Sequence, residues 1–219
     1  MTPIGILGGT FDPVHYGHLR TAMELRECLG FAEVRFVPCR IPPHDKAPVA
    51  PVDLRVAMLA AAIEDTAGFF IDDRELHREG PSYSVDTLTS MRQDLPDRPL
   101  CLIVGMDAFA GLTSWHRWQE LLSLAHIIVA HRPGAASLYD DALQALLDRR
   151  RSCDPADLGR EPFGRILLHS VTQLDISSSA IREGVARGES QNFLLPDRVV
   201  EMIESSGCYA EAARRSVHK

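Results

Sequence analysis

The sequence predicts an α/β fold: a single doubly wound, Rossmann-like parallel sheet with helices on both faces. Apolar runs of strand length alternate with segments of helical periodicity along the chain. In such an alternation crossover helices join the strands, which makes the strands parallel and covers both faces of the sheet. The chain has 219 residues, 45% of them hydrophobic, and is therefore long enough to bury one such core.

Six apolar runs have the length of a strand. The first, "PIGILG", ends in glycine, and the second, "EVRFVP", ends in proline, two residues that commonly terminate a strand. The fourth and fifth runs, "PLCLIVG" and "HIIVAHR", are apolar enough to be buried on both faces. In chain order the predicted strands are 3–8, 33–38, 69–73, 99–105, 126–132 and 165–170.

Helical periodicity and capping residues mark the segments between and after these strands. In the first, Leu19, Ala22 and Leu29 fall on one side, and Gly30 supplies a stop. Serines open the third and sixth helical segments as caps, and Pro196 suits the first position of the last. In chain order the predicted helices are 16–29, 52–66, 82–95, 115–122, 138–151, 177–188 and 196–206.

The remaining segments set the domain organisation. We expect residues 1–210 to form one domain, including the C-terminal helices from about residue 177, and residues 211–219 to form a disordered tail. The proline-rich segment 39–51 is longer than a connection requires, which indicates a functional loop. Segment 152–162 is predicted to be a loop.

Charge and composition exclude several classes of protein. The net charge of −7 and the lack of a basic face argue against binding of DNA or RNA, but not against a small anion in a locally positive pocket. No apolar run is long enough to span a membrane, and no secretory signal is apparent. Scattered cysteines without a CxxC pair predict a cytoplasmic protein with reduced thiols and no structural zinc: Cys28, Cys39, Cys101, Cys153 and Cys208.

The stretch "GGTFDPVHYGHL", residues 8–19, carries the clearest chemical signal. Gly8 and Gly9 allow a ligand to approach the backbone, and the helix that follows presents its positive end to an anion. His15 and His18 share a face if both lie in the first helical turn. The stretch is neither a Walker A loop nor a GxGxxG motif. An ordinary strand-to-helix turn, packed imidazoles or a metal pair remain alternatives.

Two further segments, "GMDA" (105–108) and "HRP" (131–133), follow the fourth and fifth predicted strands. Ligands of doubly wound sheets bind outside the carboxyl ends of the strands, where the winding reverses. We therefore expect these segments and the glycine stretch to meet at one site.

These residues carry a family resemblance. "GGTFDPVHYGH" resembles the (T/H)xGH signature of the nucleotidyltransferase superfamily, and "ISSSAIR" (176–182) resembles its ISSTxIR signature. "GPSYSVDTL" (80–88) and "GMDAFAGLTSWHRWQELL" (105–122) are similar to segments of bacterial nicotinate-nucleotide adenylyltransferases. The likeness runs from about residue 3 to 209 in family order, so the resemblance makes 1–210 a nucleotidyltransferase domain.

The resemblance implies transfer of the adenylyl group of ATP to nicotinate mononucleotide in NAD biosynthesis, giving deamido-NAD and pyrophosphate. The acceptor 5′-phosphate attacks the α-phosphate in line, without a covalent intermediate, so catalysis is positioning and charge stabilisation. By the motif match His18 stabilises the α-phosphate, His15 holds ATP phosphate and Arg182 binds the β- and γ-phosphates. Mg²⁺ would be carried by ATP phosphates and water, with no protein ligand.

The implied ATP contacts come from three segments. Ser177 could equally be only a helix cap, and so could Asp107. The implied ATP-binding residues are Gly8, Gly9, Thr10, Phe11, His15, His18, Gly105, Asp107, Ile176, Ser177 and Arg182.

On the acceptor side, the family stacks nicotinate on the tryptophan matching Trp115 and binds its carboxylate through main-chain amides matching Ser84 and His116. A nicotinamide NH₂ would face those donors unpaired. Trp115 could instead be an ordinary aromatic, and Arg132 a solvated charge at a strand end. Asp45 occupies the position of the basic residue in the family's PPHK loop, and Lys46, one position later, could supply the phosphate contact. The implied acceptor-binding residues are Lys46, Tyr83, Ser84, Thr87, Trp115, His116 and Arg132.

Alternative functions remain at this stage. The enzyme could prefer nicotinamide mononucleotide, or the chain could be a catalytically silent nucleotide sensor. A pantetheine-phosphate or cytidylyl transferase relative would share the histidine pair, but would leave "SYSVDTL" and "TSWHRWQELL" without a purpose. A homo-oligomer is compatible with the sequence.

Overall fold

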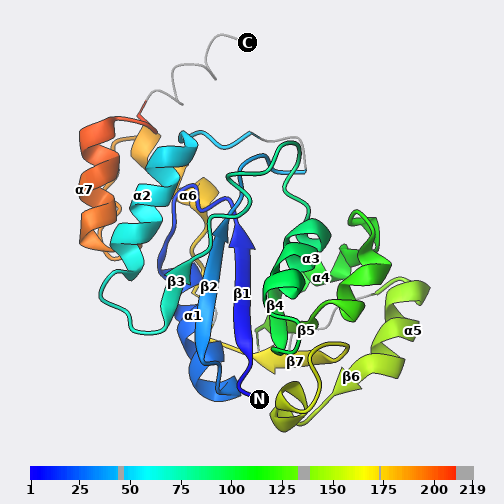
Figure 1. The fold of residues 1–219 in the computed structure, drawn as a ribbon. Helices are drawn as coiled ribbons and strands as arrows, with labels where there is room; N and C mark the ends of the chain where they lie inside the picture. Colours follow the sequence, from blue (N-terminus) through cyan, green and yellow to red (C-terminus); the bar gives the residue numbers. More distant parts are fainter. Residues whose placement is uncertain (44–46, 133–138, 173, 211–219) are drawn as a thin grey trace.

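The protein is built on a seven-stranded sheet in which every pairing is parallel (Figure 1). The computed structural model describes residues 1–43, 47–132, 139–172 and 174–210. The strands are β1 (Ile4–Gly9), β2 (Glu33–Pro38), β3 (Phe69–Ile71), β4 (Leu100–Gly105), β5 (His126–His131), β6 (Arg151–Ser152) and β7 (Ile166–Ser170). Their order is β3-β2-β1-β4-β5-β7-β6, so the winding reverses between β1 and β4.

The two central strands part before they end. Pairing between β1 and β4 stops at Ile6 and Leu102, although the strands run on to Gly9 and Gly105. Each continues instead with its outer neighbour, β1 with β2 and β4 with β5. A crevice therefore opens between β1 and β4 at their carboxyl ends, where doubly wound sheets bind ligands.

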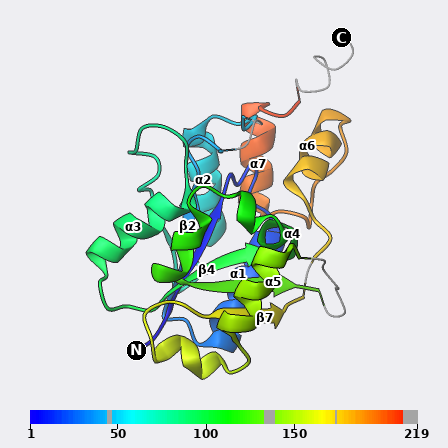
Figure 2. The same cartoon turned by 90° about the vertical axis from the view of Figure 1, so that its right-hand side faces the viewer.

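Helices cover both faces of the sheet (Figures 1 and 2). One core cluster includes Cys101 and Ile103 of β4, and the other includes the alternating Leu100, Leu102 and Val104, because successive side chains of a strand point to opposite faces. The first cluster packs under α1 (Tyr16–Leu29), α2 (Val52–Ile63), α6 (Ser178–Ala186) and α7 (Asp197–Ser206). The second packs under α3 (Ser84–Asp94), α4 (Met106–Ala110), α5 (Asp141–Arg150) and the 3-10 helix η2 (Trp118–Ser123).

The predicted doubly wound sheet is confirmed, and several elements have the predicted bounds. α1 and β2 begin and end at the predicted residues, and Gly30 ends α1 in the left-handed conformation. Ser177 caps α6, since its Oγ accepts a hydrogen bond from Ala180 N at 3.2 Å. The expected tail, 211–219, lies outside the described residues.

Other predictions about elements were wrong. The segment 115–122 is not one helix, because Arg117 takes a left-handed φ of 50° and only the 3-10 turn η2 follows it. Serine does not cap α3, since Tyr83 holds the cap position and Ser82 Oγ accepts from Arg40 N instead. Pro196 precedes the first residue of α7.

Other elements end at residues different from those predicted, or lie in segments predicted to be loops. α2 ends at Ile63 rather than at residue 66. The predicted loop 152–162 contains the 3-10 helix η3 (Pro155–Gly159), and Arg151–Ser152 form the edge strand β6 through pairing with β7. Such short elements have no periodic sequence pattern, and their conformation is determined by the segments that they contact. One more 3-10 turn, η1 (Leu112–Ser114), follows α4.

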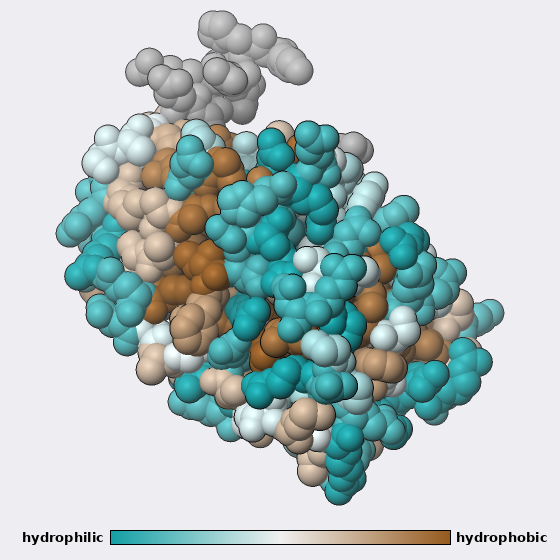
Figure 3. Space-filling model, viewed as in Figure 1, coloured by the Kyte–Doolittle hydropathy of each residue, from teal (hydrophilic) through white to brown (hydrophobic). Residues whose placement is uncertain are grey.

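The surface is mainly hydrophilic on the face seen in Figure 3, apart from an apolar strip over α2. That strip follows from the alanine-rich sequence of α2, in which Ala57 and Ala60 are exposed. Within the described ranges, none of the helices combines the length and apolar character needed to cross a bilayer.

The requirement for a left-handed backbone at Gly30, the residue that ends α1, can be tested by substitution. Gly30 has a φ of +65°, and a methyl group added there would meet open space. We expect Gly30→Ala to lower the free energy of unfolding by about 1 kcal/mol, solely through the left-handed backbone. Gly111→Ala is the matched control, because Gly111 has a φ of −90° and room for the methyl group. Urea denaturation measures both, and equal stabilities would contradict the expectation.

Candidate active site

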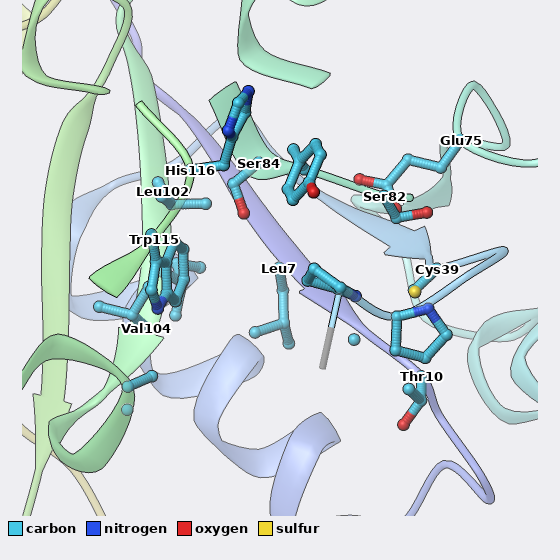
Figure 4. Close-up of a pocket in the computed structure, with 18 of the residues that line it drawn as sticks. Leu7, Thr10, Cys39, Glu75, Ser82, Ser84, Leu102, Val104, Trp115 and His116 are labelled. Carbon is cyan, nitrogen blue, oxygen red and sulfur yellow. The ribbon is translucent and has the colours of Figure 1, made fainter. Parts of the chain in front are cut away.

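A cavity of about 770 Å³ fills the crevice between β1 and β4 (Figure 4). Its walls come from the ends of the two parting strands, the loop after β2, the start of α3 and the loop after η1. The lining residues are Leu7, Gly8, Gly9, Thr10, His18, Cys39, Pro42, Pro43, Glu75, Ser82, Tyr83, Ser84, Leu102, Ile103, Val104, Gly105, Ala108, Ser114, Trp115 and His116.

Two histidines cap the first turn of α1. His15 is the N-cap residue, and its Nδ1 accepts a hydrogen bond from Gly17 N at 3.1 Å. His18 Nδ1 accepts from His15 N at 3.3 Å, so the imidazoles form a reciprocal capping box with ring centroids 3.8 Å apart. A neutral imidazole that accepts through Nδ1 carries its proton on Nε2. Each ring is therefore a donor at Nε2, the polarity that a phosphate oxygen requires.

Burial keeps both imidazoles uncharged at neutral pH. It lowers the pKa of His15 from 6.5 to about 4. Burial, with the neighbouring His15, lowers the pKa of His18 to about 3. The positive potential of the site must then come from other groups, such as the N-terminus of α1.

Gly17 explains why a glycine separates the histidines. A Cβ at Gly17 would lie 2.8 Å from His15 Nδ1 and 3.4 Å from Ile176 O. The glycine therefore makes room for the imidazole cap and for the close approach of the segment before α6. By contrast, a Cβ at Gly8 would meet nothing within 4 Å, and one at Gly9 would meet the ring of Phe11 at 3.2 Å.

The N-terminus of α6 lies against the loop that precedes α1. Ser178 Oγ donates to Pro13 O at 2.9 Å. Arg182 Nη1 donates to Asp12 O at 2.6 Å, and its Nη2 donates to Ser179 Oγ at 3.2 Å. Two helix N-termini and a guanidinium are thus brought beside the imidazoles, an arrangement that favours a polyanion.

The opposite end of the cavity is aromatic. The ring of His116 stacks on that of Tyr83, with centroids 4.2 Å apart. Trp115 faces the cavity beside Val104, with Ser84 across from it (Figure 4). Ser84 is the first residue of α3, where backbone N–H groups have no partner within the helix. This end can therefore accept a flat ring that carries an anionic group.

The structure does not bring every predicted residue to the cavity lining. Thr87 is buried in α3, and its hydroxyl donates to Glu75 Oε1 at 2.5 Å. Asp107 is exposed in the first turn of α4. Arg132 lies in a second hollow, beside α1, and pairs with Asp175 at 3.0 Å.

The other predicted residues lie near the cavity or outside the described ranges. Phe11 is buried with its ring edge-on to His18, 5.2 Å between centroids. His15, Ile176, Ser177 and Arg182 stand behind the lining at the N-termini of α1 and α6. Lys46 lies outside the described residues.

Sequence reasoning missed four buried polar residues around the cavity. Asp12, within the glycine stretch, and Arg55, a charge inside an apolar helix, are both buried. Arg55 donates to Thr10 O and Cys39 O, tying together the ends of β1 and β2. Cys39 and Glu75 line the cavity, and burial raises the pKa of each. Only the charge of Arg55 within its apolar run could have signalled a role in advance.

Among the residues with described positions, no three His, Cys, Asp or Glu side chains converge as a metal site. The buried carboxylate of Asp12 already accepts three hydrogen bonds, from Val49 N, Ala50 N and the hydroxyl of Tyr209. The donor set of the site is suited to phosphate rather than to a protein-bound cation.

The fold and the imidazole site define a nucleotidyltransferase. The family model described as cytidylyltransferase-like matches residues 6–184, which include the glycine stretch, the histidine pair and Arg182. The structure is also similar to that titled "Plasmodium falciparum nicotinic acid mononucleotide adenylyltransferase complexed with NaAD", with a TM-score of 0.74 and 20% identity over 95% of this chain and 98% of that one. At that identity the likeness concerns the fold.

Sequence relatives give the particular family. A protein of Methylococcus capsulatus named "Probable nicotinate-nucleotide adenylyltransferase" is 51% identical over 95% of this chain and 100% of its own length. A protein of Aeromonas hydrophila with the same name is 48% identical, covering 96% and 98%. The chain belongs to the nicotinate-nucleotide adenylyltransferase family. The resemblance inferred from the motifs is confirmed.

The depressed pKa values predict a stability that falls in acid. The unfolded chain binds protons at these histidines below about pH 6.5, whereas the folded chain does so only near pH 4 or 3. Stability contributed by each is complete above about pH 6.5 and is lost as the pH falls towards the folded value. When the pH is lowered from 6.5 to 4.5, we expect the free energy of unfolding to fall by about 2 kcal/mol less in His18→Asn than in the wild type.

Urea denaturation across this pH range measures the effect. His77→Asn is the matched control, because the His77 ring is exposed, and it should follow the wild-type curve. Parallel pH curves for His18→Asn and the wild type would show that the ring is not buried uncharged.

Proposed function

We propose that this enzyme transfers the adenylyl group of ATP to nicotinate mononucleotide, giving deamido-NAD and pyrophosphate in NAD biosynthesis. The observation that carries the proposal is that His18, beside the convergent N-termini of α1 and α6, lines the same cavity as Trp115. One end of that cavity suits a polyphosphate and the other suits an aromatic acid.

The chemistry needs no general base, because the acceptor 5′-phosphate is already an anion. Its oxygen attacks the α-phosphorus in line, and the bond to the β-phosphate oxygen breaks. His18 donates from Nε2 to the charge that develops on the α-phosphate, and His15 donates to a neighbouring phosphate oxygen. Arg182 and the N–H groups of α6 after Ser177 receive the departing pyrophosphate. Neutral donors held rigidly by backbone hydrogen bonds require no reorganisation during the reaction.

On the acceptor side, the nicotinate ring stacks on Trp115, and its carboxylate accepts from the main-chain amides of Ser84 and His116. Glu75 also lines the cavity, and burial raises the pKa of its carboxyl group. Nicotinamide would present an NH₂ group to the same donors and leave them unpaired, which is a large penalty in a desolvated site.

Several residues keep proposed roles from the family pattern. Asp107 and Arg132 lie at the carboxyl ends of β4 and β5, where they can reach ribose or phosphate groups. Thr87 acts through Glu75, a cavity-lining residue to which its hydroxyl donates a hydrogen bond. Lys46 supplies a phosphate contact. Main-chain atoms of Gly8, Gly9, Thr10, Phe11, Gly105 and Ile176 complete the ATP contacts.

Mg²⁺ enters with ATP in this proposal, held by phosphate oxygens and water, and it neutralises part of the triphosphate charge. The net charge of −7 argues against nucleic acid as a ligand. We place the enzyme in the cytoplasm on its unpaired, scattered cysteines.

A paired acceptor assay tests the function. Purified protein with ATP and Mg²⁺ should form deamido-NAD and pyrophosphate from nicotinate mononucleotide, with a kcat/KM at least about 100-fold above that for nicotinamide mononucleotide. Equal values would refute the acceptor assignment. ATP binding without turnover on either acceptor would instead identify a sensor.

Removal of the His18 imidazole tests the catalytic assignment. We expect His18→Ala to lower kcat about 100-fold or more while both KM values change little, because its donor acts mainly on charge formed in the transition state. Steady-state kinetics measure the split, with His77→Ala as the control for loss of an exposed imidazole. A large rise in KM at unchanged kcat would assign His18 to ground-state binding instead.

A further inference from the structure

We propose that Asp12 and Tyr209 are positioning residues for Arg182, so that residues 207–210, which follow α7, complete the triphosphate site. The inference rests on the proposed function, because it takes Arg182 to be a ligand of the ATP phosphates. It adds two residues that neither bind substrate nor belong to the cavity lining.

Asp12 is a buried carboxylate with donors from distant parts of the chain. Its Oδ2 accepts from Val49 N at 2.8 Å, and its Oδ1 accepts from Ala50 N at 3.0 Å. The hydroxyl of Tyr209 donates to Oδ1 at 2.8 Å, from a residue 197 positions further along the chain. Asp12 is only 3% exposed, so these donors replace the water that the charge would otherwise bind.

Arg182 is held by the same residue. Its Nη1 donates to the main-chain oxygen of Asp12 at 2.6 Å and lies 3.7 Å from the carboxylate Oδ2. The first contact is a hydrogen bond, whereas the second is an ion pair beyond hydrogen-bonding distance. Two of the five N–H donors of the guanidinium are engaged by Asp12 and Ser179 in the described structure, and the others can serve phosphate.

Tyr209 controls how strongly the carboxylate attracts this guanidinium. Its side chain is fully buried, and burial together with the charge of Asp12 raises the pKa of the phenol, so the hydroxyl remains a donor. If that donor were removed, Oδ1 of Asp12 would keep only Ala50 N. The less compensated charge would draw Arg182 towards itself and away from ATP.

The fold holds Tyr209 in a fixed position from which its hydroxyl donates to Asp12. α7 stands beside α2 in both views of the fold, and Val199 and Ile203 anchor it in the first core cluster (Figures 1 and 2). Gly207 ends the helix in the left-handed conformation, and Tyr209 turns back into the core. Arg55 of α2, which interacts electrostatically with Asp12, adds a second buried positive charge.

A mutant cycle on ATP binding tests the proposal. Calorimetry of the full chain with ATP and Mg²⁺, without acceptor, gives Kd for the wild type, Tyr209→Phe, Arg182→Ala and the double variant. We expect Tyr209→Phe to weaken ATP binding about tenfold and to leave the KM for nicotinate mononucleotide unchanged. In the Arg182→Ala background the same substitution should have no further effect, because Tyr209 acts through Arg182.

Tyr139→Phe is the control, since it removes a tyrosine hydroxyl that is partly buried and contacts Met106 Sδ at 3.3 Å, and it should bind ATP as the wild type does. Should Tyr209→Phe fail to fold, as judged by urea denaturation, Asp12→Asn takes its place in the cycle. It removes the charge that competes with phosphate for Arg182, so ATP should bind at least as tightly as to the wild type, and the substitution should have no effect in the Arg182→Ala background. Wild-type affinity in Tyr209→Phe, or an equal loss in the Arg182→Ala background, overturns the proposal.

The outcome also separates this inference from the proposed function. If the wild-type chain binds ATP but forms no deamido-NAD, the function fails while the mutant cycle still decides the role of Tyr209. If the wild-type chain does not bind ATP, both fall.

Discussion

The site depends on the reciprocal cap that His15 and His18 form at the start of α1. Each Nδ1 accepts a backbone N–H, which orients both rings and places the proton of each on Nε2. The same burial that holds the rings lowers the pKa of each, so they act as neutral donors. The sequence HYGH thus combines a helix start with the pair of donors that we propose for phosphate. Its glycine is required because a side chain would strike His15.

The cavity itself is a consequence of sheet topology. β1 and β4 are adjacent because the winding reverses there, and their pairing ends at Ile6 and Leu102. Beyond that point the strands diverge with their outer neighbours, and the cavity lies in the opening between them. Glycine at the end of each strand keeps the floor of the crevice low enough for a nucleotide to lie across it.

An acidic protein can still offer the triphosphate site that we propose, because the electric field that acts on a ligand is local. Neutral imidazoles, two helix N-termini and Arg182 supply donors without a large excess of positive side chains. Asp12 offsets part of the Arg182 and Arg55 charge while its main-chain oxygen holds Arg182 in place. The arrangement moderates the positive charge around Arg182 and keeps its side chain oriented.

The sequence by itself determined the order of six of the seven strands and of the longer helices, the bounds of α1 and β2, and the residues that carry the family resemblance. These depend on periodicity and on neighbours a few positions apart, which any local stretch displays. Only the tertiary structure decided that the predicted helix 115–122 is interrupted at Arg117. It also decided that Thr87 donates a hydrogen bond to Glu75 and that Tyr209 donates one to Asp12. Such contacts join residues far apart in the chain, and no local pattern encodes which buried polar groups will satisfy one another once the sheet has formed.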